Sequence, residues 1–215
     1  MIKETDFKTF LYISKKKYQI FVYHKSNSKN LYNEEMNINE DMELNNLLIF
    51  LDKNIFKIEK KINNFINDVI LIVEDEKIFN TNIGIKKKNY EKLVDQKYLE
   101  NNLTEIKDIF RENYQNQIIM HMIIINDDYL CLEVNFISIP NSFTFIFDKL
   151  LENHQIKIER YMSASYIKSF FAEDKTELSL MAKKIYNGLN KNEVKLVSRN
   201  KENKGFFERF FQLFS

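Results

Sequence analysis

The sequence predicts an α/β protein: a mixed sheet, a small inserted α+β lobe and a C-terminal amphipathic helix. Short runs typical of strands alternate with longer segments of helical periodicity along the chain. The run 68–73 is almost entirely apolar, as expected for a strand buried on both faces of a sheet. With 215 residues, 44% of them hydrophobic, the chain is long enough for one domain with an inserted lobe.

The first part of the chain is expected to form three strands, a long helix and a buried strand. Apolar residues recur every three or four positions in the helical segment, which places them on one face. This order predicts a right-handed crossover between parallel strands. The expected ranges are strands at 7–13, 18–23 and 30–36, a helix at about 42–64 and the buried strand at 68–73.

The rest of the chain is expected to form a second group of elements. A hairpin is predicted around 126–128 (Asn-Asp-Asp), a composition typical of turns. One helix is expected to begin beside Pro140 and the last to end near Gly188. The expected ranges are strands at 77–85, 118–125, 129–139 and 156–160, and helices at 98–114, 143–153, 163–172 and 176–189.

Composition excludes several classes of function. The 32 Lys and Arg residues nearly balance the 31 Asp and Glu residues, so no overall positive field attracts nucleic acid. The single cysteine, Cys131, excludes a disulfide framework and a cysteine-rich metal site. The N-terminus lacks the apolar core of a secretion signal, and no apolar run approaches the ~20 residues that span a bilayer. We therefore expect a cytoplasmic protein.

The sequence contains no recognisable catalytic, cofactor-binding or metal-binding constellation. Its three histidines, His24, His121 and His154, lie far apart, and none has a partner at metal-ligand spacing. His121 lies in an apolar run and is expected to be a hydrogen-bonded core residue. The acidic run 74–76 follows a strand end and is interpreted as a solvated turn, because no phosphate loop or basic partner is recognisable. We expect a protein that is not an enzyme and holds no cofactor or metal.

The C-terminal segment carries the most specific signal. Wound as a helix, residues 205–215 place their large apolar side chains on one face and their polar side chains on the other. A polar, basic stretch at 198–204 precedes them. This combination is typical of a helix that lies on a membrane surface. The predicted membrane-binding residues are Phe206, Phe207, Phe210, Phe211, Leu213 and Phe214, with the basic residues Lys201, Lys204 and Arg209.

The energetics of this segment suit reversible attachment. Half-immersion of six large apolar side chains contributes roughly 5–8 kcal/mol before the cost of ordering the helix. One alternative is that the segment folds back onto the core of the protein. Another is that it docks into a groove of a partner protein as an amphipathic helix. The large size of the apolar side chains and the polar spacer before them favour binding to a membrane over these alternatives.

The order of the elements resembles the N-terminal half of the FtsA family of actin-like cell-division proteins. The resemblance lies in segments 121–129 (His-Met-Ile-Ile-Ile-Asn-Asp-Asp-Tyr), 132–138 (Leu-Glu-Val-Asn-Phe-Ile-Ser), 142–167 and 179–188 (Ser-Leu-Met-Ala-Lys-Lys-Ile-Tyr-Asn-Gly). It implies a partial actin-like (ribonuclease H-like) sheet with an inserted lobe like the family's subdomain 1C. The implied division is 1–76 and 156–190 for the sheet, 77–155 for the lobe, 191–204 for a linker and 205–215 for the membrane helix.

The departures from the family pattern concern nucleotide binding. The family's first phosphate-binding turn reads Asp-Ile-Gly-Thr/Ser, whereas 12–15 here reads Tyr-Ile-Ser-Lys, without a carboxylate or a glycine. The family's subdomains 2A and 2B, with the second phosphate loop, the adenine pocket and the FtsZ-peptide site, have no room in this chain. Nucleotide binding and that peptide site are therefore expected to be lost.

The resemblance implies a non-enzymatic, membrane-peripheral scaffold of bacterial cell division at the inner face of the cell membrane. Its expected partners are the inner-membrane lipid surface and other division proteins, including a filament of the FtsA or FtsZ type. Self-association is a further expected contact, and the lobe at 77–155 is the expected partner surface. The alternatives are a soluble adaptor whose aromatic tail docks into a partner, as in pilus-platform relatives of the fold, and an actin-like ATPase.

Overall fold

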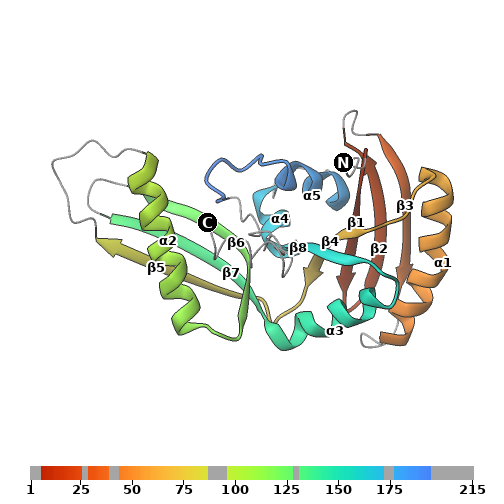
Figure 1. Ribbon diagram of the computed structural model, residues 1–215, viewed down its shortest axis with the longest axis horizontal. Coiled ribbons are helices and arrows are strands. Elements are labelled where there is room, and N and C mark those ends of the chain that lie inside the picture. The colour runs from red at the N-terminus through yellow and green to blue at the C-terminus, as the bar shows by residue number, and fades with distance from the viewer. Residues whose placement is uncertain are drawn as a thin grey trace, which may run out of the picture.

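The computed structural model describes residues 6–25, 29–38, 44–86, 96–127, 131–171 and 177–194, with side chains in the fourth range from residue 99. They form two sheets that lie side by side, one of five strands and one of three (Figure 1). The elements in chain order are β1 (Phe7–Ser14), β2 (Lys17–His24), β3 (Asn30–Asn37), α1 (Leu44–Ile62), β4 (Asp68–Glu74), β5 (Phe79–Lys86), α2 (Gln96–Asn113), β6 (Gln117–Asp127), β7 (Cys131–Pro140), α3 (Asn141–Glu152), β8 (Lys157–Ser163), α4 (Ala164–Phe170) and α5 (Leu178–Tyr186).

The larger sheet is mixed, with the strand order β3-β2-β1-β4-β8. β1, β2 and β3 form an antiparallel meander, whereas β4 is parallel to β1 and β8 is parallel to β4. Ser14 pairs with Glu74, and Val73 pairs with Ser163. The carboxyl ends of β1, β4 and β8 therefore meet at one edge of the sheet.

Helices cover both faces of the larger sheet. Successive side chains of a strand point to opposite faces, so β1 contributes Leu11 and Ile13 to one core and Phe10 and Tyr12 to the other. The first core packs against α1 and α3, and the second packs against α4 and α5. The apolar run of β4 is fully buried between these two layers, as the sequence predicted.

Helix α1 follows the predicted periodicity closely. Leu47, Leu51 and Ile58 are completely or almost completely buried against the sheet. The helix ends where Asn63 adopts a left-handed conformation with φ 53°. The amide of Asn64 then donates to the Glu59 carbonyl at 3.2 Å, a hydrogen bond typical of a Schellman cap. The helix therefore ends at Ile62, two residues before the predicted end.

The smaller sheet, β5-β7-β6, is antiparallel and carries α2 on one face. Its core is separate from the two cores of the larger sheet. Phe110 of α2 and Phe136 of β7 stack with ring centroids 4.5 Å apart at its centre. β5 follows β4 in sequence, and β8 returns to the larger sheet after α3. The smaller sheet is thus an insertion between two parallel strands of the larger one.

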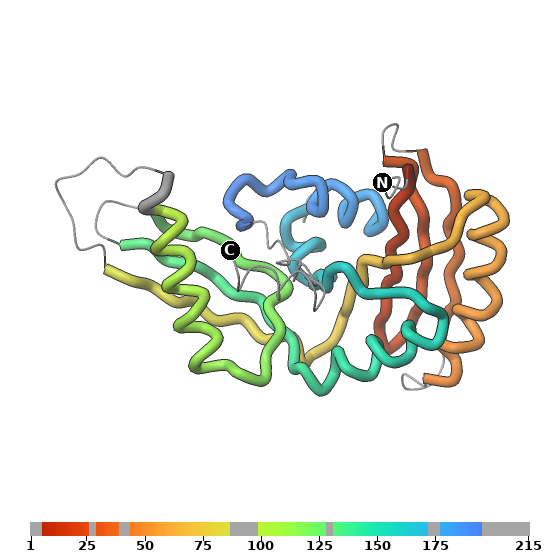
Figure 2. Tube along the Cα trace, viewed as in Figure 1, coloured from red at the N-terminus to blue at the C-terminus, as the bar shows by residue number. Residues whose placement is uncertain are grey.

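The last described residues return from the larger sheet to the smaller one (Figure 2). α5 is followed by Gly188, whose φ of 85° ends the helix near the predicted residue. The chain then runs antiparallel to the free edge of β6. There the Ile124 amide donates to the Asn192 carbonyl at 2.9 Å, and the Val194 amide donates to the Met122 carbonyl at 2.8 Å.

Candidate functional site

A pocket of about 580 Å³ opens where the carboxyl ends of β1 and β4 meet. This edge is where ligands usually bind in open α/β sheets. The pocket includes the turn at 12–15 that the resemblance aligned with a phosphate-binding turn. The lining residues are Tyr12, Ser14, Lys15, Lys16, Lys17, Asn37, Glu74, Asp75, Glu76 and Ser165.

A serine side chain, in place of a glycine, organises the turn between β1 and β2. Ser14 Oγ accepts hydrogen bonds from the amides of Lys16 and Lys17, at 3.3 and 3.0 Å. This local arrangement replaces the open backbone that a phosphate would need for close approach. The turn is thus stabilised from within the chain.

Glu74 is the centre of a charge network on one wall of the pocket. Tyr12 donates its hydroxyl proton to Glu74, and Lys168 of α4 donates to both carboxylate oxygens at 2.8 and 2.7 Å. Burial, followed by the bond to Glu74, raises the pKa of Tyr12 to about 12. Burial also opposes ionisation of Glu74, but hydrogen bonds from Lys168 and Tyr12 outweigh it and lower the Glu74 pKa. The interpretation of 74–76 as a solvated turn is therefore wrong for Glu74.

Two of the lysines that line the pocket are also paired within the chain. Lys15 forms an ion pair with Glu76 at 2.9 Å, and Lys17 forms one with Glu35 at 2.9 Å. These carboxylates neutralise the lysines that could otherwise attract a phosphate. The lysines at this edge of the sheet are thus neutralised by carboxylates of the same chain, and we call it the self-neutralised edge. This pairing disfavours the binding of an anion. Within the described ranges, no group of three or more His, Cys, Asp or Glu side chains is placed to hold a metal ion.

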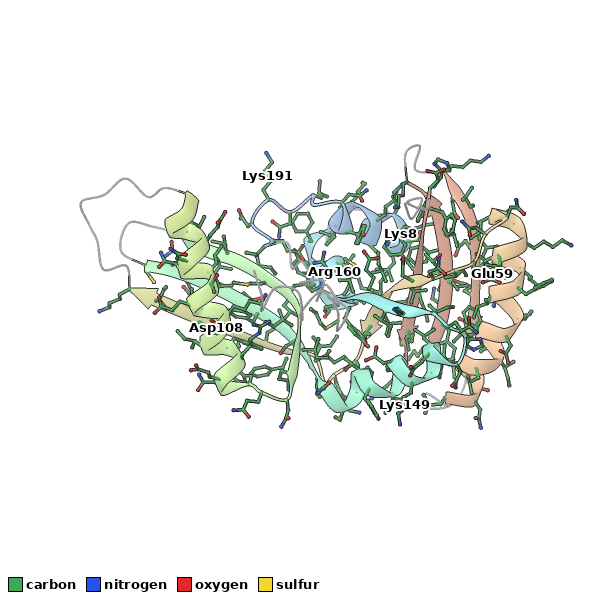
Figure 3. All side chains as sticks on the ribbon, in the orientation of Figure 1. Lys8, Glu59, Asp108, Lys149, Arg160 and Lys191 are labelled. Atoms are coloured by element: carbon green, nitrogen blue, oxygen red, sulfur yellow. The ribbon has the colours of Figure 1, made fainter. Side chains whose placement is uncertain are left out.

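A second polar cluster lies between the two sheets and is centred on Glu193. The Glu193 carboxylate forms a 2.7 Å contact with His121 Nδ1 of β6 and an ion pair with Arg160 of β8. It also accepts a hydrogen bond from the Tyr166 hydroxyl of α4 at 3.3 Å. Figure 3 shows Arg160 in this position between the sheets. One carboxylate thereby ties the last described residues to both sheets.

The hydrogen bonds of His121 define its protonation state. The Ser163 amide donates to His121 Nε2 at 2.9 Å, so this nitrogen must be unprotonated. The remaining proton lies on Nδ1, which donates to Glu193. Burial is the main cause that lowers the pKa of His121, and the nearby positive charge of Arg160 acts in the same direction against the opposing effect of Glu193. The prediction of a hydrogen-bonded core histidine is confirmed.

Glu193 itself is held as a carboxylate. Burial opposes its ionisation, but the hydrogen bond from His121 and the charge of Arg160 outweigh this effect and lower the Glu193 pKa. Only 5% of the side chain is exposed, so the charge is compensated by the protein and not by water. The segment that carries Glu193 begins the predicted linker.

The predicted membrane-binding residues at 201–214 lie outside the described residues. Among the described helices, none is long and apolar enough to cross a membrane. Of the other two histidines, His24 ends β2 and His154 follows α3, and neither belongs to the Glu193 cluster. Sequence reasoning missed Lys168 as the partner of Glu74, Glu193 as the partner of His121, and Arg160 as the partner of Glu193. No local pattern links these residues, which lie between 33 and 94 positions apart.

No family model matches this chain, and no curated protein sequence matches it. Solved structures do match. A structure described as the PilM-PilN type IV pilus biogenesis complex matches with a TM-score of 0.55 and 7% identity, over 80% of this chain and 51% of that chain. At this identity the likeness concerns the fold alone.

Two further structures match less closely. A Bacteroides thetaiotaomicron protein with an actin-like ATPase fold and unknown function has a TM-score of 0.37 and 17% identity, over 80% of this chain and 60% of that chain. The cytoplasmic domain of EpsL, an inner-membrane component of the type II secretion system of Vibrio cholerae, has a TM-score of 0.40 and 8% identity. This match covers 75% of this chain and 57% of that chain. This chain therefore spans between 51% and 60% of the length of the three structures.

The fold is α/β with a partial actin-like sheet. Three antiparallel strands, a helix and a buried parallel strand lead into an inserted lobe, and a second parallel strand follows it. This is the order that the resemblance predicted. The fold class is therefore confirmed at the level of the actin-like sheet.

Proposed function

We propose that this chain is a non-enzymatic scaffold that attaches to a membrane through its C-terminal segment and holds partner proteins there. The observation that carries this proposal is the anchoring of Glu193 between the two sheets. A membrane-bound tether can hold a folded domain in a defined position only if the tether begins at a residue that is fixed within that domain. The buried carboxylate provides such a point immediately before the basic spacer and the aromatic stripe at 205–215.

The self-neutralised edge of the larger sheet supports the non-enzymatic part of the proposal. Lys168, Lys15 and Lys17 each pair with a carboxylate, and Ser14 occupies the turn where a phosphate would approach the backbone. A protein that had retained nucleotide chemistry would need these groups for its ligand. Their internal pairing fits a fold that is used for binding alone.

Cell division is the setting that the resemblance to FtsA favours. In that setting the scaffold would link division proteins to the inner face of the cell membrane, with the lobe at 77–155 as the partner surface. It would itself be cytoplasmic and peripheral. Its partners would be lipid and a division filament, with self-association as a further contact.

Pilus assembly is the second candidate setting. The structure with the TM-score of 0.55 is a complex between two pilus biogenesis proteins, PilM and PilN. In this alternative the chain is an adaptor, and its aromatic segment docks into a groove of a protein partner instead of lipid. The two candidates share the folded body and differ in what the residues at 206–214 contact.

Co-sedimentation with anionic vesicles tests the membrane contact. We expect the full chain to bind and a chain that ends at Asn203 to bind much more weakly, because the truncation removes all six predicted apolar contacts. Phe170→Ser, at a partly exposed phenylalanine of α4, is the matched control and should bind like the wild type. Equal binding of the full and the shortened chain would refute the proposal.

A peptide of residues 201–215 separates the two candidate settings. Binding of the peptide to anionic vesicles supports the scaffold on lipid. A peptide that ignores vesicles but is retained by a purified partner protein supports the adaptor.

A further inference from the structure

Exposed apolar side chains concentrate on one helix. The three most exposed large apolar residues of the described part are Phe56 and Phe65, each 72% exposed, and Ile49, 61% exposed. Ile49 and Phe56 belong to α1, and Phe65 follows its end. Single exposed apolar residues are ordinary on a protein surface, whereas a cluster of the largest ones usually marks a contact surface.

The cluster forms a continuous line on α1. Ile49, Lys53, Phe56 and Lys60 are spaced by four, three and four residues, so they follow one face of the helix. At 100° per residue this face is opposite to Leu47, Leu51 and Ile58, which are buried against the sheet. Apolar and lysine side chains therefore alternate along the outermost line of the helix. We name Ile49, Lys53, Phe56 and Lys60 the outer face of α1.

No described element covers the outer face of α1. The helix lies at one end of the molecule, with the larger sheet on its inner side (Figure 1). Lys53, Lys57 and Lys60 are exposed and form no ion pair with any residue in the described part of the chain. Three cations and two large apolar side chains thus face away from the protein.

The acidic residues of α1 do not cancel this charge on the outer face. Asp52 lies 3.7 Å from His154 Nε2, which follows α3. The Glu59 carboxylate accepts a hydrogen bond from the Ile66 amide at 3.1 Å, beyond the end of the helix. Both carboxylates lie on the border of the outer face, and α1 carries four lysines, Lys53, Lys57, Lys60 and Lys61, against these two acidic residues. The outer face is therefore basic as well as apolar.

We propose that the outer face of α1 is a second lipid-contact surface, with anionic phospholipid as its ligand. Phe56 and Ile49 would enter the boundary between headgroups and acyl chains, and Phe65 would extend the apolar contact. Lys53, Lys57 and Lys60 would bind the headgroup phosphates, with their apolar stems along the boundary.

The charge pattern distinguishes lipid from a protein partner. The centres of protein–protein interfaces are depleted in lysine, because a buried ammonium group needs a dedicated partner. Here lysines alternate with the apolar residues along the middle of the face. A fluid anionic surface can satisfy such a pattern, since its phosphates move to the lysines.

This inference rests on the proposed membrane function and adds a defined orientation to it. The described chain ends beside β6, whereas α1 lies on the far side of the larger sheet (Figure 1). Two separate lipid contacts on one body restrict how it can rotate on the membrane.

The test uses the full chain with substitutions on the outer face. Ile49→Ser/Phe56→Ser removes the apolar contact, and Lys53→Gln/Lys60→Gln removes two charges. Phe170→Ser and Lys86→Gln are the matched controls, because both residues are exposed, Phe170 belongs to α4 on the opposite face of the larger sheet, and Lys86 ends β5 in the smaller sheet. Circular dichroism and urea unfolding of each variant verify that the fold is retained. Binding is measured by co-sedimentation with phosphatidylglycerol-containing vesicles and with pure phosphatidylcholine vesicles.

We expect each double variant to lower the partition coefficient on anionic vesicles on the order of tenfold, with both controls unchanged. The lysine variant should also show a weaker dependence of binding on salt, and it should match the wild type on phosphatidylcholine. Wild-type binding by both double variants would overturn the inference. Loss of self-association in size-exclusion chromatography, with lipid binding retained, would overturn it in favour of a contact between copies of the chain.

The same measurements separate this inference from the proposed function. If the chain that ends at Asn203 loses binding and the α1 variants do not, the tail is the only lipid contact and the inference fails. If the α1 variants lose binding and the shortened chain does not, the α1 contact stands and the proposed tail anchor fails. Additive losses would support both contacts.

Discussion

The carboxylate of Glu193 lies 2.7 Å from Nδ1 of His121, in a region where neither side chain is substantially exposed. The same carboxylate pairs with Arg160, so residues of three separate segments share one buried charge. The pair joins the end of the described chain to β6 and β8. Both the stability of the junction and its response to pH depend on this contact.

Glu193→Ala should destabilise the protein by about 3 kcal/mol, because it leaves the Arg160 guanidinium without its buried partner. The free energy of unfolding is measured by urea denaturation. Glu112→Gln, at an exposed position of α2, is the control and should stay within about 0.5 kcal/mol of the wild type. A loss equal to that of the control would mean that the Glu193 cluster contributes nothing to stability.

Stability should fall as the pH is lowered below about 6.5, the ordinary pKa of histidine. Burial lowers the pKa of folded His121, so the unfolded chain binds a proton that the folded chain resists. The lowered pKa of Glu193 acts in the same direction, but only below its ordinary value of 4.5. The urea midpoint measured between pH 7.5 and 5 would check this expectation.

His121→Gln provides the comparison for that pH series. The variant lacks the imidazole, so its stability should change less between pH 6.5 and 5 than that of the wild type, although its overall stability is lower. If the stability of the variant changed with pH as steeply as that of the wild type, His121 would not be the group responsible for the pH dependence.

Glu74→Gln/Glu76→Gln should increase the affinity of the pocket for pyrophosphate by on the order of tenfold. The two carboxylates neutralise Lys168 and Lys15, and their replacement removes two negative charges that repel an anion from the wall of the pocket. Calorimetric titration of the wild type with ATP should give no saturable heat, while the variant should bind pyrophosphate measurably. Saturable ATP binding by the wild type would contradict the interpretation of a self-neutralised edge.

Ser163→Ala should cost about 1 kcal/mol, because Ser163 caps α4. Its Oγ accepts a hydrogen bond from the Tyr166 amide at 3.3 Å. The backbone amide of Ser163, which donates to His121, is retained in the variant. Ser169→Ala removes an exposed hydroxyl within the same helix and is the control for thermal denaturation. A larger loss than about 2 kcal/mol would indicate that the His121 contact is disturbed as well.

Much of the fold could be predicted from local patterns. The apolar run of β4 and the periodic leucines and isoleucines of α1 predicted both elements to within two residues at each end. The hairpin of β6 and β7 was also predicted, although β6 continues through Asn126 and Asp127, which were expected in the turn. Regular elements follow from side-chain periodicity, since one face must be buried.

The candidate site could be predicted only in part. The acidic run 74–76 was recognised as the end of a strand, the place where α/β sites collect, but its lysine partner comes from α4, 94 residues later. His121 was correctly predicted to be hydrogen-bonded in the core, without its partners. Glu193 lies in a polar segment with no periodicity, so no local pattern marks it as buried.

The sequence by itself determined the elements and their order, because each depends on neighbours within a few residues, whereas the inserted position of the smaller lobe was implied by the resemblance to a known family. It also determined the amphipathic pattern at 205–215, whose contact stays a prediction. Only the tertiary structure decided which charges meet. Parallel strand pairing brings Lys168 to Glu74, and the return of the chain from α5 to β6 brings Glu193 to Arg160. Pairing between such distant segments leaves no signature in local composition.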